Sequence, residues 1–212
     1  MSWSKHEPRG RRGYHHGNLR EALIGAALEL IGEKGPAGFT FADAARAAGV
    51  SSAAPYRHFR DRDALMADVA RRGFERFAAA LSRAWNEGRP DPLRAFDDLG
   101  RGYLAFARQE PAYYAAMFES GIPQDADPAL RLAADEAFGV LRSACEAVCA
   151  LVPAANRPPA LMMSLHVWAQ AHGIAALFVR PDPGRRPLPM SPEDLLEANV
   201  LIYLRGIGVP GR

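Results

Sequence analysis

The 212-residue chain is 49% hydrophobic and carries a formal net charge of +2, a composition typical of a globular protein and not of a disordered chain. Two cysteines are too few for a disulfide framework, which fits a reducing cytoplasm. The N-terminal stretch has no apolar core, so we expect no secretory signal, and we find no run approaching the roughly 20 apolar residues of a membrane helix. We therefore expect a cytoplasmic protein without a membrane partner.

The charge is unevenly placed along the chain. Residues 1–90 carry a net charge of +5, and residues 91–212 carry a net charge of −3. A basic front half favours a polyanionic partner, although a skew of this size also arises by chance. The basic, glycine-rich residues 1–17 have no periodic pattern, and we expect them to form a mobile arm.

Two helices are expected after this arm. Asn18 is a suitable N-cap for a helix that reaches about Lys34, and the apolar residues between them follow helical spacing. Thr40 begins a second helix, because Asp43 stands three residues later in a capping-box pattern. This helix must end at Gly49, since glycine tolerates the left-handed backbone found at many helix ends.

A third, short helix is expected directly after Gly49. Either Ser51 or Ser52 can cap it, and the helix is expected to reach about Phe59. Ser52 is preferred, because Pro55 then falls in the first turn, where its missing N–H costs no hydrogen bond.

The rest of the chain predicts more helices and no strand, separated by segments rich in proline and glycine. The expected fold is all-α with about nine helices. We divide it into the arm at 1–17, a three-helix unit at 18–62 and a helical body at 63–212. The six remaining helices are expected at about 61–85, 93–109, 111–119, 128–151, 159–179 and 192–207.

A helix, a glycine-centred turn and a capped second helix form the helix-turn-helix pattern, whose second helix is normally set in the DNA major groove. The segment FTFADAARAAGVSSAAPYRHFRDRDAL resembles the DNA-binding domain of the TetR (tetracycline-repressor) family, and this likeness extends over residues 14–66. The body resembles a subgroup named for a Trp-His-Gly motif, through EPAYYAAMF (110–118) and Trp168-x-x-x-His172-Gly173. The residues that match the family's DNA-binding pattern are Thr40, Ala45, Gly49-Val50-Ser51, Tyr56-x-His58-Phe59 and Leu65.

The resemblance implies DNA-contacting roles for residues in this motif. Tyr56 and His58 stand at positions that clamp the DNA backbone in the family, and arginines beside them supply charge. Pro55 stands where the family often has Leu, and Arg62 replaces the family's usual Lys. The candidate DNA-binding residues are Thr40, Ser51, Ser52, Ala53, Ala54, Tyr56, Arg57, His58 and Arg62, with Ser52, Ala53 and Ala54 facing bases and Arg60 adding charge.

Two alternatives for these DNA contacts remain open. Tyr56 and His58 can instead cover an apolar surface of the domain. The RGRRGYHHG arm can enter the minor groove beside the recognition helix or remain a solvated tail.

The body is rich in aromatic residues, and in the family this region holds a cavity for a ligand that releases the protein from DNA. An aromatic-lined cavity with few polar anchors suits a small, largely apolar effector, although aromatics at helical spacing are usually core. His172 could bind a ligand, sense pH or bond a neighbouring carbonyl. The candidate ligand-binding residues are Tyr103, Tyr114, Phe118, Trp168 and His172.

The last two expected helices combine small residues on one with branched apolar residues on the other, which suits tight helix pairing. The family dimerises through these helices, so we expect a homodimer through residues 159–207. Cys145 and Cys149 are four residues apart on one helix and could bind a metal or sense redox state, or could simply be small buried apolar residues.

The resulting hypothesis is a dimeric transcriptional regulator, a repressor that an apolar ligand releases from double-stranded operator DNA. One alternative is a DNA-binding regulator controlled by a partner protein. Another is a metal or redox sensor acting through Cys145 and Cys149. The chain has no GxSxG motif, no metal-ligand cluster and no phosphate-binding loop, so we expect neither enzymatic activity, nor a metal, nor a cofactor.

Overall fold

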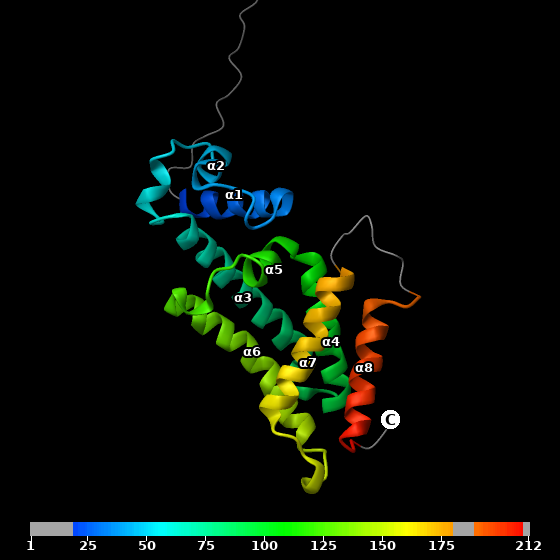
Figure 1. The fold of residues 1–212 in the computed structure, drawn as a ribbon. Coiled ribbons are helices and arrows are strands. Elements are labelled where there is room, and N and C mark those ends of the chain that lie inside the picture. Colours follow the sequence, from blue (N-terminus) through cyan, green and yellow to red (C-terminus); the bar gives the residue numbers. More distant parts are fainter. Residues whose placement is uncertain (1–18, 180–188, 210–212) are drawn as a thin grey trace, which may run out of the picture.

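The computed structural model describes residues 19–179 and 189–209, and within these residues it contains α-helices and no strand (Figure 1). The expected all-α class is confirmed. The predicted arm at 1–17 lies outside the described residues. The α-helices are α1 (Leu19–Lys34), α2 (Phe41–Ala47), α3 (Arg62–Trp85), α4 (Pro92–Gln109), α5 (Pro111–Phe118), α6 (Pro128–Cys149), α7 (Ala160–Ile174) and α8 (Pro192–Gly206).

The described part therefore contains eight α-helices, where about nine helices were expected. The predicted helix at 52–59 is replaced by a single 3₁₀ turn, η1 (Ala54–Arg57). The predicted helix at 159–179 is α7 followed by a π-helical segment, Ala175–Val179. The other predicted boundaries agree with the structure to within about two residues, a normal uncertainty at helix ends.

Side-chain caps explain where several helices begin. Thr40 and Asp43 form the expected capping box at the start of α2, and Ser191 and Asp194 form another at the start of α8. Asp61 caps α3 by accepting a hydrogen bond from the Ala64 backbone N–H at 2.8 Å. Each cap satisfies a backbone donor that the first helical turn leaves without a partner.

Helices α1 and α2 lie with η1 at one end of the molecule, and we call these elements the head (Figure 1). The 24-residue helix α3 runs from the head into the body, where it packs against α6, α4 and α5. In Figure 1, α7 and α8 occupy the side of the body remote from the head's α2. One buried cluster of apolar residues extends from Leu23 in α1 to Val209 after α8, so no break in the core separates head and body. The division of the chain into a three-helix unit at 18–62 and a helical body at 63–212 stays a prediction.

An ionic cluster ties α1 of the head to α3. The buried Asp68 carboxylate lies 2.9 Å from the Arg20 guanidinium and 2.8 Å from that of Arg71, while Arg72 pairs with Glu21. Burial alone would raise the pKa of Asp68, but hydrogen bonds and positive charge from Arg71 and Arg20 hold it below its usual value. The start of α1 is therefore fixed to the first half of α3.

One segment departs from the expectation about membranes. Ala160–Phe178 is long and apolar enough to cross a membrane by length and composition, and one third of its tested window is buried. A helix of a soluble core or interface meets the same criteria.

Candidate nucleic-acid interface and ligand cavity

The joint between α2 and η1 depends on the conformation of Gly49. Its φ of 72° lies in the left-handed region, which glycine adopts without the steric cost that a Cβ brings. The Gly49 backbone N–H donates to the Arg46 carbonyl, and the Val50 N–H donates to the Ala45 carbonyl, each at 3.0 Å. These bonds close α2 and turn the chain sharply toward η1, as the sequence predicted.

The element after the joint is shorter than expected. Neither Ser51 nor Ser52 caps it, since Ala53 occupies the N-cap position without a side-chain hydrogen bond. Pro55 accounts for the difference through its neighbour, because a proline disfavours α-helical backbone at the residue before it, here Ala54. The Ala54 N–H instead donates to the Ser51 carbonyl at 3.0 Å in a tight turn. The head therefore presents one 3₁₀ turn where a two-turn helix was predicted.

The side chains around this turn form an exposed polar surface on the head. Tyr56 is 63% exposed, and its ring packs edge-on against Phe41 with the ring centroids 5.1 Å apart. The Phe41 contact fixes the direction of the Tyr56 ring. Pro55 and Ala54 lie inward of this surface. Its other exposed residues are Ser51, Ser52, Ala53, Arg57 and His58.

Two of the predicted DNA-binding residues already have partners within the head. The Thr40 hydroxyl lies 2.6 Å from an Asp43 carboxylate oxygen and accepts from the Asp43 N–H at 3.1 Å, so it holds the start of α2. The Arg62 guanidinium donates to the carbonyls of Phe39, at 2.9 Å, and Pro36. It also lies over the Phe39 ring, 4.9 Å from the centroid. Arg62 therefore holds the loop between α1 and α2 on the start of α3.

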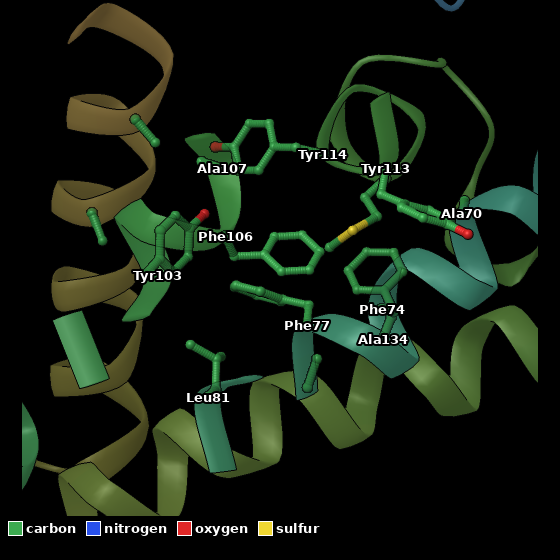
Figure 2. Close-up of a cluster of buried hydrophobic side chains, with 14 of the residues drawn as sticks. Ala70, Phe74, Phe77, Leu81, Tyr103, Phe106, Ala107, Tyr113, Tyr114 and Ala134 are labelled. Atoms are coloured by element: carbon green, nitrogen blue, oxygen red, sulfur yellow. The ribbon is translucent and has the colours of Figure 1, made fainter. Parts of the chain in front are cut away.

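The body contains a cavity of about 280 Å³ between α3, α4, α6, α7 and α8. Its walls are mostly apolar, and three predicted ligand-binding residues line it: Tyr103, Phe118 and Trp168. Figure 2 shows how Phe74 and Phe77 of α3 lie among the aromatic side chains of α4 and α5. The other aromatic lining residues are Phe96 and Phe138.

The two remaining predicted residues lie behind the cavity wall. His172 Nδ1 is 2.9 Å from the Tyr103 hydroxyl and 2.9 Å from the Tyr114 hydroxyl, so residues from α4, α5 and α7 meet at one atom. The Tyr114 and His172 rings are stacked, with centroids 5.7 Å apart. Burial lowers the pKa of His172 despite the nearby Glu119 carboxylate. Burial also raises the pKa of Tyr103 well above its usual value, so both groups are held neutral.

Comparison with known proteins assigns the chain to a family. A family model described as "Bacterial regulatory proteins, tetR family" matches residues 23–69, and one described as "Tetracyclin repressor-like, C-terminal domain" matches residues 96–202. The chain belongs to the TetR family. A TetR-family regulator binds DNA through its helix-turn-helix head and is not an enzyme. Family membership therefore confirms the prediction of a DNA-binding regulator and the prediction that the protein is not an enzyme.

Solved structures have the same TetR fold. A protein of unknown function from a Rhodococcus species is 30% identical, with a TM-score of 0.74 over 92% of this chain and 98% of its own. The TetR family regulator PfmR from Thermus thermophilus is 20% identical, with a TM-score of 0.66 over 86% and 97% of the two chains. The fatty acid degradation regulator FadR from Bacillus halodurans is 15% identical, with a TM-score of 0.68 over 93% and 100%. No curated protein matches the chain.

These comparisons leave the finer subgroup open, since the C-terminal match is to a tetracycline-repressor-like domain. The Trp-His-Gly subgroup therefore stays a prediction.

In this TetR chain, sequence reasoning missed the cavity residues on α3: Phe74, Phe77 and Leu81. Their spacing of three and four residues places them on one helical face, a signal present in the sequence.

The two cysteines lie in the core of the TetR body. Cys145 is fully buried, and the Cys149 sulfur lies 3.4 Å from the Met163 sulfur. Burial raises the pKa of Cys145 to about 12, so this thiol stays protonated at neutral pH. Among residues 19–179 and 189–209, no group of three or more His, Cys, Asp or Glu side chains is placed to hold a metal ion.

Proposed function

We propose that this TetR-family protein is a cytoplasmic, dimeric repressor that a small, largely apolar ligand releases from operator DNA. The observation that carries the proposal is the course of α3. The helix begins at Arg62, which holds the loop of the head, and it presents Phe74, Phe77 and Leu81 to the cavity. A ligand that displaces these side chains acts on the same rigid helix that supports the head.

On the DNA side, we assign Tyr56 and His58 to phosphate contacts, with charge from Arg57. All three side chains are exposed on one face of the head, and such contacts give affinity without sequence information. Ser52 and Ala53 face the bases from the short turn. Alanine offers only a methyl group, so shape and spacing of the DNA carry much of the discrimination.

The other predicted DNA-binding residues take supporting roles in this proposal. Thr40 positions the start of α2 through Asp43, and Arg62 positions the α1–α2 loop through two carbonyls. Ser51 and Ala54 shape the turn, since the Ala54 N–H donates to the Ser51 carbonyl.

The proposed homodimer forms through α7 and α8, within the predicted range 159–207. These helices expose large apolar side chains, an arrangement that a subunit interface would cover. The same interface would cover part of the membrane-length segment Ala160–Phe178. A twofold axis there would place two heads on successive major grooves, roughly 34–36 Å apart. The exposed apolar residues are Leu161, Met162 and Leu165 on α7, Leu177 in the π-helical segment after it, and Ile202 on α8.

The mechanism is a shift between two populations. The unliganded dimer fits the groove spacing, and the ligand favours a form whose heads do not. The alternative, control by a partner protein, is favoured by a filled core, and the cavity of about 280 Å³ argues against it. Sensing through Cys145 and Cys149 is not favoured either, because burial keeps the thiols protonated.

The experiment takes the operator from the genome that encodes this protein. Fragments retained by the full-length protein are sequenced, and the enriched sequence is tested by fluorescence anisotropy. Apolar compounds are then screened for a rise in melting temperature, and those that bind are tested for release of this DNA. We expect compounds that do both. If many compounds bind the cavity and none weakens DNA binding, the ligand-released repressor is wrong, although the DNA-binding function stands.

A further inference from the structure

The Tyr103 hydroxyl, on a residue that lines the cavity, already has its hydrogen-bond partners inside the protein. It lies 2.9 Å from His172 Nδ1, and it has further side-chain hydrogen bonds with Tyr114 and Trp168. The Tyr114 hydroxyl also lies 2.9 Å from His172 Nδ1 (Figure 2 shows the two tyrosines). A polar ligand group buried beside these side chains would therefore lose its hydrogen bonds to water without replacement, which is costly.

The other polar side chains of the cavity lie at its solvated rim. Apart from Tyr103 and Trp168, the polar lining residues are Gln124, in the 3₁₀ turn η3 (Gln124–Ala126), and Asp135 on α6. Both are exposed, and the Asp135 side chain is 72% exposed. A ligand can therefore bury an apolar body in the cavity and keep a polar group at this rim, in contact with water.

The charge at this rim is negative. Asp135 is the single charged residue among the described residues that line the cavity. Residues 119–136, which supply both rim side chains, contain five acidic residues and one basic residue. The basic residue, Arg131, lies 3.8 Å from Asp135, and both side chains are exposed, so water screens this pair and a ligand cation can replace Arg131. An anionic ligand group at the rim would be repelled and a cationic one attracted.

We propose that the effector is an amine, with one or two aromatic rings in the apolar cavity and one protonated amino group at the rim, which donates a hydrogen bond to the Asp135 carboxylate. This inference rests on the proposed function and deepens it by naming the class of ligand. The cavity volume of about 280 Å³ lies near the lower end of the roughly 300–1,000 Å³ typical of small-molecule pockets, which suits a body of this size. The apolar contacts supply affinity, and Asp135 selects the charge of the ligand.

The test compares four compounds that share one naphthalene body. They are the cation of 2-(2-naphthyl)ethylamine, the anion 2-naphthylacetate, the neutral 2-(2-naphthyl)ethanol and the hydrocarbon 2-ethylnaphthalene. Dissociation constants for the full-length protein come from calorimetry at about 0.15 M salt, with the hydrocarbon measured by competition against the amine. An ion pair between exposed groups changes affinity by up to roughly fivefold, and like-charge repulsion acts by a similar factor. We expect the amine to bind roughly tenfold more tightly than the acetate, with the alcohol between them.

Two charge reversals on α6 isolate the rim carboxylate. Asp135→Lys should reverse the preference, so that the acetate binds more tightly than the amine. It should leave the affinity for the hydrocarbon unchanged, which reports that the cavity is intact. Glu136→Lys is the matched control, because Glu136 is also exposed and the net charge changes equally, but this residue does not line the cavity. Because surface charges are screened beyond roughly 8 Å at this salt concentration, Glu136→Lys should keep most of the preference for the amine.

The outcomes separate this inference from the proposed function. If the amine and the acetate bind equally, or if the two reversals have the same effect, the assignment of Asp135 is wrong while the effector cavity stands. If the acetate binds most tightly to the parent protein, the ligand class is wrong. If the amine shows the expected preference but does not release operator DNA, the ligand class stands and the ligand-released repressor fails. If none of the four compounds binds, the effector cavity fails, and this inference fails with it.

Discussion

Replacing Arg62 tests whether this residue supports the head or contacts DNA directly. Its side chain is 24% exposed, and its guanidinium donates to the carbonyls of Phe39 and Pro36. Both of these residues are buried, and the guanidinium also stacks over the Phe39 ring. The Arg62→Ala substitution therefore leaves two carbonyls without their charged donor.

The expected loss of stability follows from these contacts. A hydrogen bond to a charged group contributes about 1.5–3 kcal/mol, and a cation–π contact contributes about 0.5–1 kcal/mol more. Because Arg62 is partly solvated and water can replace some of these bonds, we expect a total slightly below the sum of the lower values, about 3 kcal/mol. For a chain of this size that corresponds to a fall in melting temperature of roughly 6–12 °C.

Two further variants separate the roles. Arg62→Lys keeps a charge for phosphate but loses the two-pronged donor, so it should be destabilised nearly as much as Arg62→Ala. Arg60→Ala removes an arginine that is 87% exposed and should leave the melting temperature unchanged. Thermal unfolding followed by circular dichroism measures all three. If Arg62 only contacts phosphate, Arg62→Lys will be as stable as the parent, and Arg62→Ala will lower the log–log salt slope of DNA binding by about one. Those results would refute the supporting role.

Three further predictions concern the DNA surface, the dimer and the buried histidine. Tyr56→Phe and His58→Ala should weaken binding to operator and random DNA by similar factors in fluorescence anisotropy, because phosphate contacts are blind to sequence; a loss confined to operator DNA would contradict this. Ile202→Glu should convert a dimer of twice the 23.0 kDa chain mass to a monomer in light scattering, while Leu132→Glu on α6 should not. Burial lowers the pKa of His172 below 6.5, so the unfolded state binds more protons and stability falls as the pH drops below about 6.5. His172→Gln should therefore lose less stability to urea between pH 7 and pH 5 than the parent protein; an equal loss would argue against the buried neutral ring.

Local signals in the sequence predicted most of the helices. The capping boxes of Thr40 and Ser191 mark the starts of α2 and α8, and Gly49 marks the turn after α2, because each of these features acts within a few residues. The same local reasoning failed at the turn after Gly49. Pro55 was placed in the first turn of an α-helix, but its effect on Ala54 shortened the element to a 3₁₀ turn.

Long-range contacts could not be predicted from spacing alone. Trp168 and His172 share a helical face, which the sequence indicated, but the meeting of His172 with Tyr103 and Tyr114 depends on how three helices pack. The charge of Arg62 likewise suggested DNA, whereas its carbonyl partners lie 23 and 26 residues away. The cavity faces of α3 were missed for the same reason, since periodicity identifies a buried face without identifying what it borders.

The central claim is that the cavity and the DNA surface are coupled through α3, and reciprocal binding tests it most directly. The affinity for operator DNA is measured with and without a saturating cavity ligand, and the affinity for this ligand is measured with and without saturating operator DNA. The account predicts that each partner weakens the other by the same factor, because coupling between two sites is reciprocal. A ligand that binds the cavity and leaves DNA affinity unchanged would contradict the coupling.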